Sequence, residues 1–145
     1  MSILVEDGAA EAGIVDVGID IVTVEDIRDS IESFGDAFLD RMYTAAELKD
    51  CDGDPARLAA VFAVKEAVLK ALRLTSAPTP PRAIEVLGAP TVTVGLRAPL
   101  DAGFDPVAES VRVSVSCDGV RAVAVAIRDL VSDAESRMAA SGEVF

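Results

Sequence analysis

The sequence has no histidine, and among its 145 residues it has only two cysteines and 13 lysines and arginines. Without histidine, no imidazole is available as a general base or as part of a Cys–His zinc site. The two cysteines, Cys51 and Cys117, are far apart in the sequence and do not have CxxC spacing. We therefore expect two reduced thiols rather than a disulfide or a metal site.

Basic charge is scarce, because 25 aspartates and glutamates outnumber the basic residues and give a net charge of -12. A surface this acidic repels phosphate backbones, so we expect neither nucleic acid nor an anionic membrane as a partner. The chain also lacks a run of about 20 apolar residues, which predicts that it has no membrane span. Its first dozen residues are acidic, unlike those of a signal peptide. Together these absences predict a cytoplasmic protein.

Apolar residues, in contrast, are plentiful, at 51% of a chain whose length is typical of one domain. We predict a flexible acidic leader over residues 1–12, one domain over residues 13–129, and a polar helix or tail over residues 130–145. This apolar content exceeds what one small core buries, which hints at an oligomer.

The segment from Leu58 to Leu72, LAAVFAVKEAVLKAL, combines helical periodicity with very little charge. Its large apolar residues recur at i, i+3 and i+4 spacing and alanines fill most gaps, so we predict a nearly fully buried helix. Its only ionisable residues are Lys65, Glu66 and Lys70, and a buried charge needs a partner. One explanation is structural: Glu66 and Lys70 are four residues apart and form an ion pair on one helix face.

A second notable acidic residue, Asp20, lies in a predicted strand. The segment VDVGIDIV, from Val15 to Val22, has the two-residue period of a strand with one apolar face. Aspartate is unfavourable in strands, so we expect Asp20 at the margin of the core. It either caps the helix that follows or has a chemical role.

Asp20 and Glu66 together form an oxygen-donor pair suited to Mg²⁺, which takes one or two carboxylates and leaves its other positions to water and substrate phosphates. Lys65 and Lys70 would then contact the phosphates. Such a site suits the cleavage of a pyrophosphate, because cations neutralise the bridging and leaving oxygens. The general base stays open between Glu66, another carboxylate and a metal-bound water.

The other elements predict an α+β fold with a small antiparallel sheet, since helices and strands do not alternate as βαβ units. A helix from about Thr23 ends at Gly35, and the capping box Thr44-x-x-Glu47 opens a short helix. An Asp-Gly turn joins two alternating strands. The predicted strands after the long helix are Ala83–Val86, Thr91–Val94, Val111–Ser116 and Ala122–Ile127.

These segments resemble a known family in their order. The runs GIDIV, FLDRMYTAAEL, LAAVFAVKEAVLKAL and VSVSCDGVRAVAVAI follow one another between Gly13 and Arg128. This ordered set resembles the holo-acyl-carrier-protein synthase branch of the 4'-phosphopantetheinyl transferases. The resemblance implies a three-stranded core sheet wrapped by helices, and a homotrimer that binds coenzyme A between neighbouring subunits.

The resemblance also implies an activity and a site. Family members transfer 4'-phosphopantetheine from coenzyme A to a serine of an acyl carrier protein or carrier domain in fatty acid or polyketide biosynthesis, and release 3',5'-ADP. Asp20 and Glu66 match the family's Mg²⁺ ligands, and with Lys70 they make up the catalytic set. The residues matching coenzyme A contacts are Arg41, Lys65, Lys70, Ser116 and Cys117. From the residues alone, Arg41 has an equal alternative, a salt bridge to Glu47.

The chain departs from the family pattern at three places. Cys117 stands where the family usually has histidine, Val61 where it commonly has arginine, and residues 73–82 replace a glycine-rich turn. A thiol is a weaker donor than an imidazolium, and valine makes no contact to a phosphate, so we expect altered or weaker nucleotide binding.

The first helix is a further departure, because family members usually present a basic helix to their acidic carriers. Here the segment from Val24 to Phe38 carries five acidic residues and one arginine. Two alternatives to the transferase therefore stay open. One is a non-catalytic member of the same fold that acts as a subunit or docking module. The other is a small acidic α+β binding domain in which Lys65 and Glu66 are only a structural pair.

Overall fold

A computed structural model describes residues 15–74, 79–88, 93–96 and 111–129, so the predicted leader and tail lie outside the described residues. The main sheet has three antiparallel strands in the order β1 (Val15–Thr23), β5 (Arg121–Asp129) and β4 (Val111–Cys117). A separate antiparallel pair consists of β2 (Ile84–Leu87) and β3 (Thr93–Leu96). The predicted α+β class with a small antiparallel sheet is confirmed.

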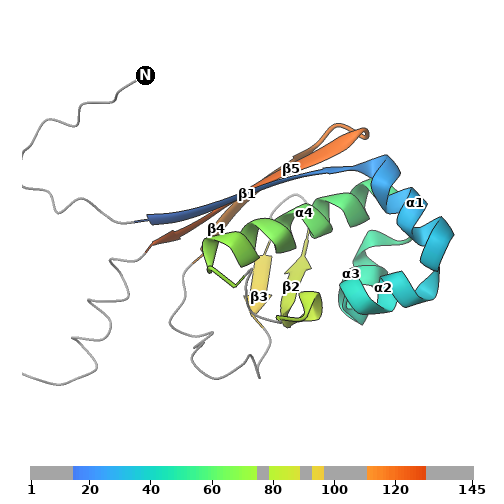
Figure 1. Ribbon diagram of the computed structural model, residues 1–145, viewed down its shortest axis with the longest axis horizontal. Coiled ribbons are helices and arrows are strands. Elements are labelled where there is room, and N and C mark those ends of the chain that lie inside the picture. The colour runs from blue at the N-terminus through green and yellow to red at the C-terminus, as the bar shows by residue number, and fades with distance from the viewer. Residues whose placement is uncertain (1–14, 75–78, 89–92, 97–110, 130–145) are drawn as a thin grey trace, which may run out of the picture.

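The long helix α4 (Pro55–Ala71) lies at the centre of the fold. Figure 1 shows it between the three-stranded sheet on one side and the β2–β3 pair on the other. Because the helix is covered by the main sheet and by the β2–β3 pair, nearly every side of it is apolar. The helix begins three residues before the predicted segment, because the Asp54 side chain accepts a hydrogen bond from the Ala56 amide and Pro55 occupies the first turn.

Three short helices connect β1 to α4: α1 (Val24–Phe34), α2 (Asp36–Met42) and α3 (Ala45–Cys51). The N-cap of α1 is Thr23, whose hydroxyl accepts a hydrogen bond from the Asp26 amide. The suggestion that Asp20 caps this helix is therefore wrong. Gly35 ends α1 with φ of +54°, as predicted, and the predicted capping box of α3 is present in full. The 3₁₀ helix η1 (Pro81–Ala83) leads into β2.

The contact between α4 and the main sheet is made by small residues. Gly18 of β1 is directly opposite Ala126 of β5 in the strand register. On the helix, Ala63, Ala67 and Ala71 recur every four residues and have no exposed surface. On β5, the inward-facing Ala122, Ala124 and Ala126 are likewise fully buried. Because neither surface carries a large side chain here, the helix and the sheet approach closely.

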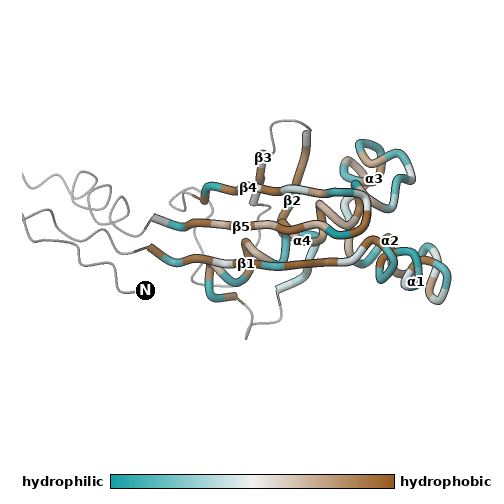
Figure 2. Tube along the Cα trace, turned by 90° about the horizontal axis from the view of Figure 1, so that it is seen from above, coloured by the Kyte–Doolittle hydropathy of each residue, from teal (hydrophilic) through white to brown (hydrophobic). Residues whose placement is uncertain are grey.

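The opposite face of the main sheet is apolar and open. Figure 2 shows β1, β5 and β4 side by side, with hydrophobic positions along β1 and β5. Among the described residues nothing shields the outward side chains of β1, which are 46–62% exposed and comprise Val15, Val17, Ile19 and Ile21. We call this surface the outer sheet face. None of the described helices is both long and apolar enough to cross a membrane.

Candidate functional site

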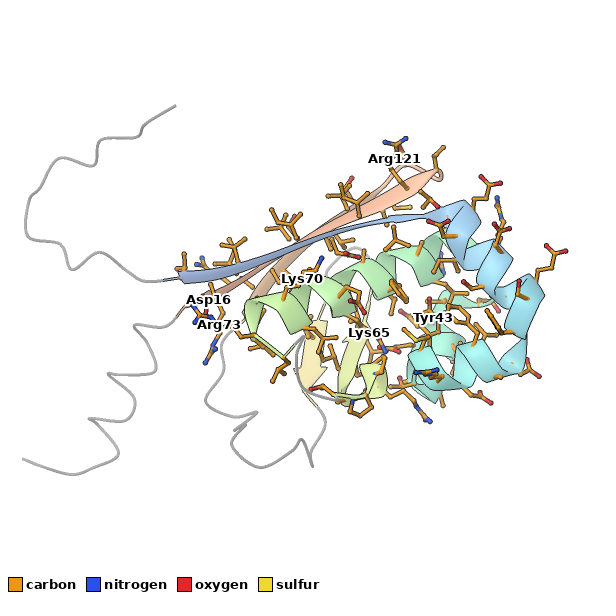
Figure 3. The ribbon with its side chains drawn as sticks, in the orientation of Figure 1. Asp16, Tyr43, Lys65, Lys70, Arg73 and Arg121 are labelled. Carbon is orange, nitrogen blue, oxygen red and sulfur yellow. The ribbon has the colours of Figure 1, made fainter. Side chains whose placement is uncertain are left out.

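The side chain of Lys70 links α4 to β1 at the edge of the core. Its ammonium group donates to Asp20 Oδ1 at 3.0 Å and to the backbone oxygen of Ile19 at 2.9 Å. Figure 3 shows Lys70 on α4 beside β1. Asp20 faces the helix because strand side chains alternate, and its neighbours Ile19 and Ile21 point outward. Glu66 lies one turn before Lys70 on the same helix face.

The electrostatics of this cluster connect Asp20 and Glu66. Burial raises the pKa of the half-buried Glu66, the negative charge of Asp20 raises it further, and Lys70 acts in the opposite direction. Two carboxylates thus share one ammonium group. The expected ion pair between Glu66 and Lys70 is replaced by a pair between Asp20 and Lys70. When all three groups are charged, the cluster keeps an excess negative charge.

Asp20 and Glu66, the two predicted metal ligands, both interact with Lys70 in this cluster. Within residues 15–74, 79–88, 93–96 and 111–129, no group of three or more histidine, cysteine, aspartate or glutamate side chains is arranged to hold a metal ion. The protein ligands available to a cation here are therefore the two carboxylates. A cation with many water or substrate ligands fits such a set, whereas a fully protein-coordinated one does not.

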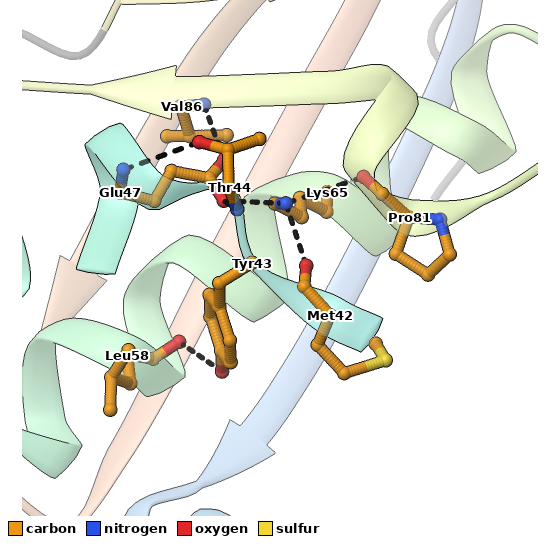
Figure 4. A network of polar contacts seen from close by, with 8 residues as sticks. All are labelled: Met42, Tyr43, Thr44, Glu47, Leu58, Lys65, Pro81 and Val86. Carbon is orange, nitrogen blue, oxygen red and sulfur yellow. Dashed lines mark hydrogen bonds and ion pairs between the residues drawn. The ribbon is translucent and has the colours of Figure 1, made fainter. Parts of the chain in front are cut away.

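Lys65, the residue before Glu66, lies in a different environment. Its side chain is 1% exposed and its ammonium group is 2.7 Å from Glu47 Oε2. It also donates to the backbone oxygens of Met42 at 2.7 Å and Pro81 at 3.3 Å. Figure 4 shows these contacts converging on the Lys65 ammonium group. All three of its donor hydrogens therefore have protein acceptors.

Glu47 completes this buried network. Its two carboxylate oxygens accept hydrogen bonds from the Thr44 amide at 2.7 Å and the Val86 amide at 2.8 Å. Burial lowers the pKa of Lys65, and Glu47 counteracts that effect. The pair joins α3, α4 and β2, so the placement of Lys65 favours a structural role over a phosphate contact. Glu47 is paired with Lys65, which also makes the suggested salt bridge to Arg41 wrong.

The other predicted coenzyme A contacts lie apart from Asp20 and Glu66. Arg41 is exposed near the end of α2. Ser116 and Cys117 are exposed at the end of β4, and the Cys117 thiol donates to the backbone oxygen of Ala56 at 3.7 Å. In the strand register Asp20 and Val115 are both opposite Ala124, so Ser116 and Cys117 lie two strands from Asp20, at the end of β4 that contacts the first turn of α4.

A cavity of about 170 Å³ lies beside the first half of α4. Val61 is part of its apolar lining, together with Val64, Val86 and Val115. Arg57, one turn before Val61 on the same helix, also lines it and makes a 3.7 Å ion pair with Asp54. The cavity thus has no basic side chain at position 61 but has one, Arg57, one turn earlier.

Comparison with known proteins identifies the family. Residues 16–126 match the 4'-phosphopantetheinyl transferase superfamily. The chain belongs to this superfamily. It is 40% identical to the holo-[acyl-carrier-protein] synthase of Chlorobaculum tepidum over 121 residues, which cover 78% of this chain and 97% of that protein. The predicted family is confirmed.

Two further relatives agree. The holo-[acyl-carrier-protein] synthase of Aquifex aeolicus is 56% identical over 59 residues, a segment that covers 38% of this chain and 48% of that protein. The Helicobacter pylori holo-[acyl-carrier-protein] synthase, solved in complex with coenzyme A, superposes with a TM-score of 0.67 at 28% identity and covers 77% of this chain and 98% of that one. The predicted transferase fold is therefore confirmed.

Three residues that join elements of the fold were not predicted to do so. Glu47 was predicted to complete a capping box and was considered as a partner of Arg41, although a lysine in an otherwise apolar helix signals a buried acidic partner. Gly18 lies within the predicted GID motif, but the sequence gives no sign of how closely it approaches α4. Arg73 is a third such contact, because its guanidinium donates to Asp16 at 2.7 Å and joins the end of α4 to β1.

Proposed function

We propose that this chain transfers 4'-phosphopantetheine from coenzyme A to a serine of an acyl carrier protein or carrier domain and releases 3',5'-ADP. The observation that carries the proposal is the meeting of Asp20, Glu66 and Lys70 where β1 crosses α4. The relatives support it, because the Chlorobaculum protein is a holo-[acyl-carrier-protein] synthase and the Helicobacter protein binds coenzyme A. We infer a cytoplasmic location and a carrier of fatty acid or polyketide biosynthesis.

The residues of this cluster fit Mg²⁺ as the cofactor. Asp20 and Glu66 supply two hard oxygen donors, and their excess negative charge favours a divalent cation. Both side chains are partly exposed, which leaves room for water and phosphate oxygens. When bound, the ion supplies positive charge to the oxygens of the diphosphate.

The chain's own residues would contribute binding, orientation and charge. The Lys70 side chain is 43% exposed and its ammonium group is held by Asp20, so it is positioned to neutralise a phosphate oxygen. A carboxylate or a water molecule at the site would accept the proton of the attacking serine hydroxyl. That hydroxyl belongs to the carrier, and no covalent intermediate on this chain is required.

We further infer that the coenzyme A site is shared between copies in a homotrimer. Within one chain, Ser116 and Cys117 lie on β4, two strands from Asp20, and the Cys117 thiol contacts the first turn of α4 rather than Glu66. The outer sheet face offers an apolar surface for another copy, since Ile19 and Ile21 are 54% and 62% exposed. A neighbouring copy would then bring its Ser116 and Cys117 toward the Asp20–Glu66 pair of the first.

The proposal is tested by thermal unfolding with coenzyme A, with and without Mg²⁺. A ligand at one hundred times its dissociation constant adds about 2.7 kcal/mol of stability. We expect a shift that depends on Mg²⁺ and that disappears in Glu66→Gln. The matched control is Glu32→Gln, which removes an exposed carboxylate on α1 and keeps the shift. Mass spectrometry of a carrier protein incubated with both ligands then measures transfer.

Cys117 and Val61 favour the second candidate, a non-catalytic module of the same fold. This candidate predicts no thermal shift at millimolar coenzyme A and no mass increase of the carrier. Either result with a folded wild-type protein contradicts the transferase proposal.

A further inference from the structure

Gly18 lies at the closest approach between β1 and α4. A Cβ atom added at this position would overlap the backbone oxygen of Ala67, and it would lie 2.8 Å from both the Ala67 carbonyl carbon and the Ala71 nitrogen. These are backbone atoms within α4, so no side-chain rotation relieves the contact. Only a glycine fits here unless the strand and the helix move apart.

Conformational freedom does not explain this glycine. Four other described glycines have positive φ, namely Gly35, Gly53, Gly88 and Gly119, whereas Gly18 does not. It pairs in regular register with Ala126 of β5, the central strand of the main sheet. The requirement at position 18 is therefore space rather than backbone geometry.

The close approach at Gly18 fixes the contacts that α4 makes with the next two residues of β1, Ile19 and Asp20. Lys70 reaches the backbone oxygen of Ile19 at 2.9 Å and Asp20 Oδ1 at 3.0 Å. Ala71, one of the residues nearest to Gly18, directly follows Lys70 on α4. Separation of the strand from the helix at Gly18 therefore moves Asp20 away from both Lys70 and Glu66.

We propose that Gly18 is a positioning residue that sets the spacing between the Asp20 and Glu66 carboxylates for binding a divalent cation. This inference rests on the proposed function. A methyl group at position 18 forces β1 and α4 apart by roughly 1 Å or more, since non-bonded carbon atoms pack at about 3.5–4.0 Å. Side chains that orient metal ligands typically change metal affinity by about 10–100-fold when altered.

The test is Mn²⁺ binding to the protein without coenzyme A, measured from the free Mn²⁺ signal in electron paramagnetic resonance. We expect Gly18→Ala to weaken binding by about tenfold or more. The matched control is Val22→Ala, on the same strand and face and also two residues from Asp20, where a side chain becomes smaller and does not force β1 and α4 apart. It lowers the melting temperature through lost packing and leaves Mn²⁺ affinity unchanged.

A second substitution, at position 20, distinguishes a displaced carboxylate from a general loss of structure. A glutamate at position 20 reaches about 1.5 Å further than aspartate, one carbon–carbon bond. We expect Asp20→Glu to weaken Mn²⁺ binding in the wild-type background and to restore it in the Gly18→Ala background. Equal weakening in both backgrounds, or wild-type affinity in Gly18→Ala, overturns the inference.

Two further outcomes have clear meanings. If Gly18→Ala does not fold, Ala126→Val tests the same spacing from the neighbouring strand, because cross-strand partners share one face of the sheet. Unchanged Mn²⁺ affinity in folded Ala126→Val then overturns the inference. If the wild-type protein itself binds no Mn²⁺, both the proposed metal function and the role of Gly18 are wrong. If only the prediction for Gly18→Ala is wrong, the proposed transfer activity still stands.

Discussion

At the scale of single residues, the adjacent Lys65 and Glu66 have opposite surroundings. Consecutive residues on an α-helix are about 100° apart, so Lys65 faces Glu47 and β2 while Glu66 faces β1. The charged pair in the sequence is therefore not an ion pair in the structure. Each member pairs or interacts with a residue from another element, and only Glu66 belongs to the candidate metal site.

This difference predicts unequal effects of removing the two lysines. Lys65→Met leaves Glu47 charged and buried without a cation, which we expect to lower the free energy of unfolding by about 3–5 kcal/mol. Lys70→Met removes a pair whose lysine side chain is 43% exposed, so we expect a loss of about 1 kcal/mol, smaller than that of Lys65→Met. Urea unfolding of both variants measures the difference.

Transfer activity provides the complementary measurement for these variants. Lys70→Met should lose phosphopantetheine transfer while its fold stays intact. Similar unfolding free energies for the two variants would contradict the structural role of Lys65.

At the scale of elements, the start of α4 shows what a local motif contributes. The apolar periodicity predicts a helix that begins at Leu58. The structure begins the helix at Pro55, because Asp54 accepts a hydrogen bond from Ala56 at 2.9 Å. Helical periodicity depends on buried side chains, so it does not detect a first turn that is only partly buried.

The cap gives an element-scale prediction. We expect Asp54→Ala to lower the free energy of unfolding by about 1 kcal/mol, because an amide in the first turn of α4 loses its acceptor. Asp29→Ala is the control: it removes an exposed carboxylate in the middle of α1 and should change stability by less than about 0.5 kcal/mol. Thermal or urea unfolding measures both, and equal effects would argue against the cap.

At the scale of the whole molecule, the outer sheet face is the surface through which we propose that copies of the chain assemble. A sheet with one face on α4 and the other exposed leaves a row of β-branched residues in contact with water. Such a surface is unfavourable unless it is covered. The proposed homotrimer covers it and also brings together residues that one chain keeps apart.

The assembly is tested by placing a charge on the outer sheet face. Ile21→Glu puts a carboxylate in the proposed contact, so we expect the trimer to dissociate into monomers that no longer bind coenzyme A. Multi-angle light scattering gives the mass. The control is Phe34→Glu, at the end of α1 and 68% exposed, which should keep the trimer mass. A monomeric wild-type protein, or a trimeric Ile21→Glu, contradicts the assembly.

The sequence by itself determined the order of elements and the family, and it predicted Asp20 and Glu66 as metal ligands. It could do so because periodicity, capping residues and short motifs are local properties of the chain. Only the tertiary structure decided that Lys65 binds Glu47, that Lys70 binds Asp20, and that Cys117 lies at the far end of α4. These outcomes depend on which faces of distant elements meet, and on the small residues at Gly18 and Ala67 that set their spacing.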